Sequence, residues 1–115
     1  MMNRSTPPRV AVVGAGYWGI NHVRNFYELG ALGLVCDTYA PSLARIAEKF
    51  PDVRIEHDLN AALDDPNIRG VVIATPAETH YRLARRAIEA GKDVLVEKPL
   101  TLDVEEGEAL IELAN

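Results

Sequence analysis

The stretch VAVVGAGYWG, residues 10–19, decides the fold of this chain, because an apolar run passes directly into three closely spaced glycines. Gly14, Gly16 and Gly19 have the spacing GxGxxG, which alone is a weak indication because it also arises by chance. The neighbouring segments give it meaning. RVAVVGAG, residues 9–16, is typical of a strand buried on both faces, and residues 18–29 carry apolar side chains at helical spacing. The glycines therefore lie in a turn between a predicted strand and a predicted helix.

The same alternation of short apolar runs and amphipathic stretches continues to the last residue. Further strands are expected at residues 32–37, 54–56, 70–76 and 93–99, and helices at 41–50, 59–63, 79–91 and after Asp103. Pro41 suits a first helical turn, and Asp58 and Asp103 can cap the helices that follow them. Strands that alternate with helices pair in parallel through right-handed crossovers, and we expect all of these strands to be apolar and buried on both faces, as a buried parallel sheet requires. We predict an α/β fold, a doubly wound parallel sheet of Rossmann type with five strands, over residues 9–115, preceded by a disordered tail at 1–8.

Each glycine of the turn has a distinct use in a dinucleotide site. Gly14 allows the tight turn, Gly16 lets a pyrophosphate approach the backbone, and Gly19 lets the helix pack close to the strand. Free N–H groups near Tyr17 and Trp18 would face the phosphates, where the helix dipole also favours negative charge. The motif therefore predicts a phosphate-binding turn.

An acidic residue stands where such a site needs one, because Asp37 ends the second predicted strand. A carboxylate there can accept hydrogen bonds from the adenosine ribose and would repel the 2′-phosphate of NADP, so NAD is the favoured cofactor. Two alternatives stay open at this point. The glycines could make only a tight turn, or the ligand could be S-adenosylmethionine, whose sites also use a glycine-rich first turn and an acidic second strand.

Two later strands end in polar segments at the edge of the sheet where ligands bind. They are Ala74-Thr75-Pro76 and Glu97-Lys98-Pro99. Oxidation of an alcohol carbon by hydride transfer also requires the hydroxyl proton to leave, so a base must lie within hydrogen-bond reach. Lys98 is the candidate for that base. Cys36, in the apolar run LGLVCD, is expected to be a buried strand residue and not a reactive thiol.

Together, VAVVGAGYWG with Asp37, then ATPAETH (residues 74–80), then VEKPLT (residues 96–101) resemble the glucose–fructose oxidoreductase, inositol dehydrogenase and MocA-like family of oxidoreductases. The resemblance implies an NAD site and a catalytic lysine, Lys98. It implies that Thr75, Pro76 and His80 lie near the nicotinamide half, that Glu97 lines the cofactor pocket and that Pro99 sets the turn direction. The cofactor-binding residues that it implies are Gly14, Gly16, Tyr17, Trp18, Gly19, Asp37, Thr75, Pro76, His80, Glu97 and Lys98.

Within that family, the segment GYWGINHVRNFYELGAL resembles the branch that oxidises C3 of UDP-N-acetylglucosamine or its uronic acid for surface polysaccharides. The implied partner is thus a nucleotide sugar. Family members are much longer two-domain chains with a sixth strand, and they form homo-oligomers. The resemblance therefore implies an excised cofactor domain that binds NAD without turnover. The alternative is a stand-alone nucleotide-binding or redox-sensing module without catalysis.

Composition and charge exclude other classes of function. The net charge of −5 argues against nucleic acid or an anionic membrane as a partner, and no apolar run approaches the roughly 20 residues that span a bilayer. The first residues lack the apolar core of a secretory signal, so a cytoplasmic location is expected. No metal-ligand spacing occurs. His22 and His57 are expected at the surface or partly packed, and Arg82, Arg85 and Arg86 on a solvated helix face.

Overall fold

The structure is a computed structural model that describes residues 9–98 and 100–115. Its strands are β1 (Arg9–Val13), β2 (Leu32–Cys36), β3 (Arg54–Glu56), β4 (Ile68–Ile73) and β5 (Asp93–Val96). Its helices are α1 (Gly19–Glu28), α2 (Ala40–Lys49), α3 (Asn60–Leu63), the 3-10 turn η1 (Ala77–Thr79), α4 (His80–Glu89) and α5 (Val104–Ala114). The tail predicted for residues 1–8 and the role predicted for Pro99 lie outside the described residues.

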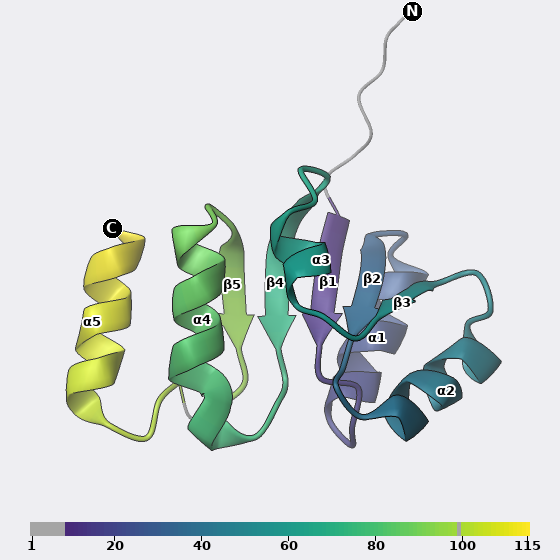
Figure 1. Cartoon of the computed structure of the whole chain (residues 1–115), viewed down its shortest axis with the longest axis horizontal. Helices are drawn as coiled ribbons and strands as arrows, with labels where there is room; N and C mark the ends of the chain where they lie inside the picture. Colours follow the sequence, from purple (N-terminus) through teal and green to yellow (C-terminus); the bar gives the residue numbers. More distant parts are fainter. Residues whose placement is uncertain (1–8, 99) are drawn as a thin grey trace, which may run out of the picture.

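The strands form one parallel sheet with the order β3-β2-β1-β4-β5 (Figure 1). The chain begins in the middle of the sheet at β1, builds outward to β3, and then returns to the other side of β1 with β4. The backbone N–H of Ala74 and the carbonyl of Val13 extend the contact between β1 and β4 beyond the strands, at 2.8 Å. The predicted five-stranded, doubly wound parallel sheet is confirmed.

Helices cover both faces of the sheet, so each central strand contributes to two cores. One core joins the sheet to α3, α4 and α5 and includes Leu34 and Ile73. The other joins it to α1 and α2 and includes Val12, Val35 and Ile46. Successive side chains of a strand point to opposite faces, which explains why the central strands read as continuous apolar runs. In Figure 1, α4 lies in front of the sheet and α1 lies behind it.

The ends of the elements differ from the prediction where function is expected. β4 begins at Ile68 and ends at Ile73, and β5 ends at Val96, so residues 74–76 and 97–98 lie beyond the strands. The capping prediction holds for Asp103, which accepts hydrogen bonds from the N–H groups of Glu105 and Glu106. At α3 the N-cap is Leu59 and not Asp58, although the Asp58 carboxylate accepts a hydrogen bond from the N–H of Asn60. The polar segments are therefore loops at the edge of the sheet.

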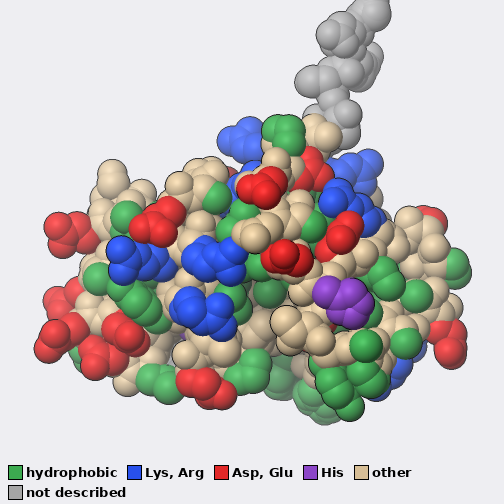
Figure 2. All heavy atoms as spheres, viewed as in Figure 1, with side chains coloured by type: hydrophobic (Ala, Val, Ile, Leu, Met, Phe, Trp, Pro, Cys, Tyr) green, Lys and Arg blue, Asp and Glu red, His purple; other side chains and the backbone are tan. Residues whose placement is uncertain are grey.

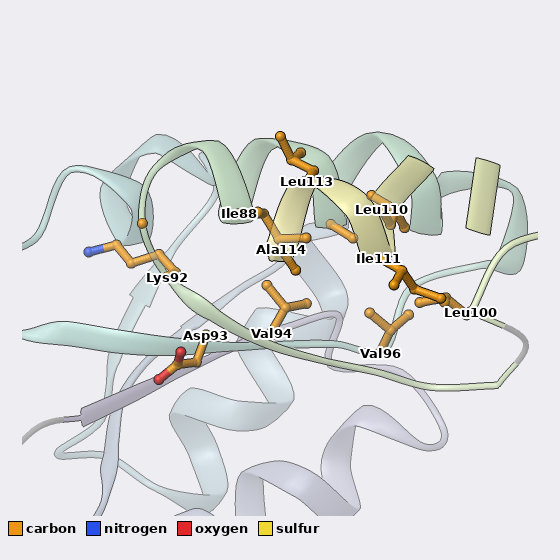
Figure 3. Close-up of a pocket in the computed structure, with 12 residues that line it drawn as sticks. Ile88, Lys92, Asp93, Val94, Val96, Leu100, Leu110, Ile111, Leu113 and Ala114 are labelled. Atoms are coloured by element: carbon orange, nitrogen blue, oxygen red, sulfur yellow. The ribbon is translucent and has the colours of Figure 1, made fainter. Parts of the chain in front are cut away.

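β5 is the least covered strand. Val94 and Val96 pack against α4 and α5, but Leu95, on the opposite face, is 53% exposed. The prediction that every strand is apolar and buried on both faces is therefore wrong for β5, because no described helix covers Leu95. Beside Val94, a recess of about 430 Å³ with mainly aliphatic walls lies between β5, α4 and α5 (Figure 3).

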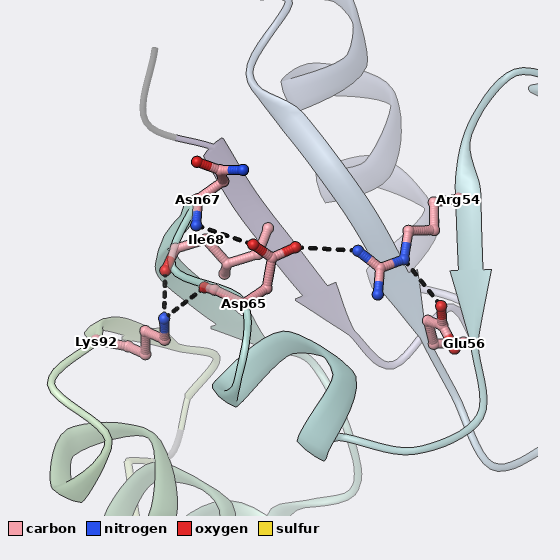
Figure 4. A network of polar contacts seen from close by, with 6 residues as sticks. All are labelled: Arg54, Glu56, Asp65, Asn67, Ile68 and Lys92. Carbon is pink, nitrogen blue, oxygen red and sulfur yellow. Dashed lines mark hydrogen bonds and ion pairs between the residues drawn. The ribbon is translucent and has the colours of Figure 1, made fainter. Parts of the chain in front are cut away.

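A polar network fastens the amino edge of the sheet (Figure 4). The Arg54 guanidinium donates to the carboxylates of Glu56 at 2.8 Å and Asp65 at 3.0 Å, and the Lys92 ammonium donates to the carbonyls of Asp65 and Ile68. The N–H of Asn67, and after it the Arg54 side chain, hold the pKa of Asp65 below its ordinary value. Polar side chains thus provide hydrogen-bond partners for backbone carbonyl and N–H groups at this edge.

Candidate functional site

The candidate site lies at the carboxyl edge of the sheet, where the loops after β1, β2, β4 and β5 meet (Figure 1). β1 has β2 on one side and β4 on the other, so the chain reverses its direction of winding at this strand. In open parallel sheets, ligands bind outside the carboxyl ends of the strands at such a switch point. The fold therefore directs attention to the turn after β1.

That turn needs two of its glycines for folding and leaves the third free. Gly14 has φ +99°, and a Cβ there would lie 2.7 Å from the carbonyl oxygen of Ala74. A Cβ on Gly19 would lie 1.8 Å from the carbonyl oxygen of Gly14, so α1 can start this close to the strand only with glycine. A Cβ on Gly16 would meet nothing within 4 Å. The fold itself therefore does not require glycine at position 16. A ligand that approaches the backbone at this position does require glycine, because a side chain would occupy the same space.

The start of α1 offers donors to an anion. The backbone N–H groups of Gly16, Tyr17 and Trp18 donate no hydrogen bond within the described part of the chain. They precede a ten-residue helix, whose dipole favours negative charge at this end. Open space at Gly16 and unused N–H groups beside it fit a pyrophosphate, which binds in this way at helix N-termini.

Asp37 lies directly after β2 and holds the turn in place. One carboxylate oxygen accepts the N–H of Ala15 at 2.8 Å, and the other accepts the N–H of Tyr39 at 2.8 Å. This structural contact was not anticipated from the sequence. A carboxylate oxygen can accept more than one hydrogen bond, so both oxygens keep capacity for ribose hydroxyls. Asp37 therefore connects the glycine turn to the end of β2 and remains half-exposed beside the site.

A cavity of about 600 Å³ opens between the glycine turn, the ends of β2, β3 and β4, and α4. Of the cofactor-binding residues that the resemblance implies, it is lined by Gly14, Gly16, Asp37, Thr75 and Pro76. His57, Asp58 and Leu59, which follow β3, form the opposite wall. Its size suits an adenosine group, because ligand pockets for small molecules begin at about 300 Å³.

The three arginines of α4 differ in their surroundings, although the sequence placed all of them on a solvated face. Arg82 and Arg86 line the cavity, and Arg86 donates to the side chain of Asn60 in α3. Arg85 instead pairs with Glu89 and Tyr81 on the same helix. Figure 2 shows Lys and Arg side chains gathered over α4, on one flank of the hollowed face. Helical periodicity could have separated Arg85 from the other two, which are four residues apart.

His80 has a structural position. Its side chain is 1% exposed, and its Nε2 lies 2.9 Å from the carbonyl oxygen of Thr75. The hydroxyl groups of Thr75 and Thr79 lie 2.6 Å apart, and Thr79 also donates to the carbonyl of Pro76. His80 does not line the cavity. It holds the loop after β4, and through that loop it orients Thr75 and Pro76.

Tyr17 and Trp18 lie on the other flank of the glycine turn. They are 85% and 63% exposed, and their rings meet edge to face with centroids 5.5 Å apart. Neither ring lines the 600 Å³ cavity, although Gly16 borders both this flank and the cavity. Gly19 is buried under the turn. The side chains of Tyr17 and Trp18 are thus available beyond the pyrophosphate position.

Glu97 and Lys98 follow β5 at the same edge but do not line the cavity. The N–H of Glu97 donates to the carbonyl of Ile73 at 3.0 Å, which extends the pairing of β5 with β4 by one residue. Its carboxylate contacts Nε2 of His22 on α1. Lys98 is exposed and has no hydrogen bond or ion pair with any other described residue.

Cys36 lines the cavity but does not provide a nucleophile. It is 3% exposed, which confirms the predicted buried position. Burial, and then the carboxylates of Asp37, Asp58 and Glu56, raise the pKa of its thiol to about 11. The thiol therefore stays protonated at neutral pH, and only the thiolate is nucleophilic. Within residues 9–98 and 100–115, no three His, Cys, Asp or Glu side chains are placed to hold a metal ion, and no helix could cross a membrane.

A glycine turn that admits phosphate, an acid at the end of the next strand and a cavity between them characterise the dinucleotide-binding Rossmann domains. The particular family follows from comparison. The profile of the GFO/IDH/MocA group, described as "Oxidoreductase family, NAD-binding Rossmann fold", matches residues 8–115. The chain belongs to this family, and its cofactor is NAD.

Relatives in the family include enzymes of two substrate classes. The chain is 37% identical over 106 residues to inositol 2-dehydrogenase of Rhodococcus jostii, covering 90% of this chain and 29% of that protein. It is 36% identical over 107 residues to UDP-N-acetylglucosamine 3-dehydrogenase of Acidithiobacillus ferrooxidans, covering 93% and 33%. The chain thus spans about a third of the length of these relatives.

Solved structures agree with the fold. The crystal structure of GenD2 from gentamicin A biosynthesis in complex with NAD superposes with a TM-score of 0.87 at 35% identity, covering 99% of this chain and 34% of that one. The structure of the A. ferrooxidans dehydrogenase GnnA superposes with a TM-score of 0.85 at 34% identity, covering 96% and 35%.

Proposed function

We propose that the chain is the cofactor half of a dehydrogenase that oxidises a hydroxyl carbon of a sugar or polyol. The observation that carries this proposal is the shared edge of the sheet, where the glycine turn, Asp37 and Lys98 all follow parallel strands. NAD supplies the hydride acceptor, and the hydroxyl proton must go to a base. Lys98, which has no described partner, is that base or the first group of its relay.

Different residues of the site bind different parts of the cofactor. Asp37 accepts hydrogen bonds from the adenosine ribose, the N–H groups of Gly16, Tyr17 and Trp18 hold the pyrophosphate, and the adenine occupies the 600 Å³ cavity. Thr75 and Pro76 line the part of that cavity nearest β4, and the bound cofactor extends past them toward β5. The nicotinamide then lies beside the loops after β4 and β5, where a substrate hydroxyl can reach Lys98. On this proposal, the substrate contacts come from the part of the relatives' length that residues 1–115 do not span.

The finer proposal for the substrate is a nucleotide sugar oxidised at C3. Support comes from the segment GYWGINHVRNFYELGAL and from the A. ferrooxidans relative, whose substrate is UDP-N-acetylglucosamine. An inositol is the second candidate, since the R. jostii relative is equally similar over the same length.

The test uses the protein from its complete reading frame, mixed with NAD and one substrate at a time. NADH absorbance is followed with UDP-N-acetylglucosamine, its uronic acid, myo-inositol and scyllo-inositol. Formation of NADH with a UDP-sugar supports the finer proposal, and formation with an inositol alone replaces it. NAD binding without NADH formation from any of the four would favour the non-catalytic nucleotide-binding module.

Replacement of Arg82 by Ala tests the adenine position. Arg82 lines the cavity and its side chain has no hydrogen bond or ion pair with another described residue, so its guanidinium can cover the outer face of the adenine ring. Cation–π contacts contribute roughly 0.5–2 kcal/mol, so Arg82→Ala should weaken NAD binding about twofold to thirtyfold. Arg85→Ala removes the same charge from the same helix, outside the cavity, and should leave the Kd unchanged. Equal losses in both variants would indicate a general charge effect and remove Arg82 from the site.

Replacement of Asp37 by Asn tests the choice between NAD and NADP. The Asp37 carboxylate repels a 2′-phosphate, and like charges held close together cost several kcal/mol. Asp37→Asn keeps one oxygen for the turn and removes the charge, so the preference for NAD over NADP should fall by about tenfold or more. Isothermal titration with both cofactors measures the ratio, and the melting temperature reports any loss of the turn. A wild-type chain that binds both equally would contradict the role given to Asp37.

A further inference from the structure

The contact between His22 and Glu97 joins two motifs that lie 75 positions apart in the sequence. His22 lies on α1, about one turn after Gly19, and Glu97 immediately precedes Lys98. The two side chains are 21% and 38% exposed. The sequence suggested only a surface or partly packed histidine at His22, and it placed Glu97 in the cofactor pocket.

The alternation of β5 explains why Glu97 turns toward α1. Val94 and Val96 pack against α4 and α5, while Leu95 points to the opposite face, where α1 lies. Glu97 continues this alternation and is held in register by its hydrogen bond to Ile73. Its carboxylate therefore points away from the 600 Å³ cavity and toward α1. Because a carboxylate is only an acceptor when ionised, Nε2 of His22 must carry the proton and donate it.

We propose that His22 is a positioning residue, which fixes the Glu97–Lys98 turn against the helix of the glycine motif. The contact fixes the end of β5, and Lys98 after it, relative to α1, whose first residues follow the proposed phosphate-binding turn. The Lys98 side chain has no hydrogen bond or ion pair with another described residue, so the contact of Glu97, the residue before it, is the polar side-chain contact that anchors this turn. This inference rests on the proposed function, since it concerns the nicotinamide half of the cofactor site.

Loss of the contact between His22 and Glu97 should reduce the affinity contributed by the nicotinamide half of the cofactor alone. A loose turn must be ordered when the nicotinamide binds, and ordering backbone and side chains reduces affinity. The adenosine and pyrophosphate positions are formed by Gly16, Asp37 and the cavity, which His22 does not touch. Loss of the contact should thus weaken NAD binding and spare ADP-ribose, which lacks the nicotinamide.

The experiment compares NAD and ADP-ribose on the full chain by quenching of Trp18, the single tryptophan, which is 63% exposed at the glycine turn. His22→Leu removes the donor at similar volume and should weaken NAD about fivefold, the worth of one hydrogen bond, with ADP-ribose unchanged. His22→Gln places an N–H near the position of Nε2 and should restore the affinity for NAD. In ¹H–¹⁵N spectra, the amide signals of Glu97 and Lys98 should move in His22→Leu and return in His22→Gln.

Three results would overturn the inference. One is equal loss of NAD and ADP-ribose in His22→Leu, which indicates a merely structural role. Another is unchanged affinity for both with unmoved Glu97 and Lys98 signals. The third is a wild-type chain that binds NAD no better than ADP-ribose, because the turn then makes no contact with the nicotinamide. A wild-type chain that binds neither ligand would instead refute the cofactor site itself.

Discussion

A Gly19→Ala chain is expected to lose about 3 kcal/mol or more of its free energy of unfolding, because overpacking against rigid backbone is strongly unfavourable. The added Cβ would lie 1.8 Å from the carbonyl oxygen of Gly14, and neither atom belongs to a flexible side chain. α1 would have to move away from β1, which breaks the packing of Val23 in the second core. Thermal unfolding followed by circular dichroism should show a melting temperature lower by about 10 °C or more.

Gly16→Ala is the matched control within the same turn. Its Cβ meets nothing within 4 Å, so the melting temperature should stay close to that of the wild type. The methyl group would occupy the space through which a pyrophosphate reaches the backbone, so NAD affinity should fall by about tenfold or more. A stable Gly19→Ala chain, or a destabilised Gly16→Ala chain, would show that the glycines do not divide their roles as described.

In the protein from its complete reading frame, Lys98→Met is expected to reduce turnover by about a hundredfold to ten-thousandfold, the usual contribution of a general acid or base. Lys98 is exposed at the end of β5 and makes no described hydrogen bond, so its loss should leave the fold and the adenosine position intact. The expected pattern is a lower kcat with a nearly unchanged Kd for NAD. Steady-state kinetics and a separate NAD titration measure the two quantities.

The Lys98→Arg variant distinguishes a role of Lys98 in proton transfer from a role of its positive charge alone. Arginine keeps the positive charge and the reach of the side chain, but it is not deprotonated in proteins and cannot act as a base. Turnover in Lys98→Arg should therefore be as low as in Lys98→Met. Recovery in the arginine variant would make Lys98 an electrostatic group, and wild-type turnover in both variants would remove it from the mechanism.

The fold was predictable because local patterns and the global topology agree. RVAVVGAG, LGLVCD and GVVIATP read as buried strands since helices cover both faces of β1, β2 and β4. β5 broke the pattern, because burial of an edge strand depends on what covers it, and a sequence window contains no such information. The strand ends also shifted, and these shifts moved residues 74–76 and 97–98 from strands into loops.

The candidate site was predictable where a single turn encodes it. The GxGxxG spacing and Asp37 were found because each belongs to a short segment next to a strand. The contacts of Asp37 with Ala15 and Tyr39, the burial of His80 and the division of the α4 arginines were not found. Each of these depends on which loops meet at one edge of the sheet.

The sequence by itself determined the class of fold, and it predicted a phosphate-binding turn and an acid that favours NAD, because hydrophobic period and glycine spacing act over a few residues. Only the tertiary structure showed how closely the backbone packs at these glycines, because a Cβ would collide with backbone at Gly14 and Gly19 and would meet nothing within 4 Å at Gly16. It also brought His22 to Glu97 across 75 positions. The strand order β3-β2-β1-β4-β5 is the reason, since it places loops that are distant in sequence at one edge.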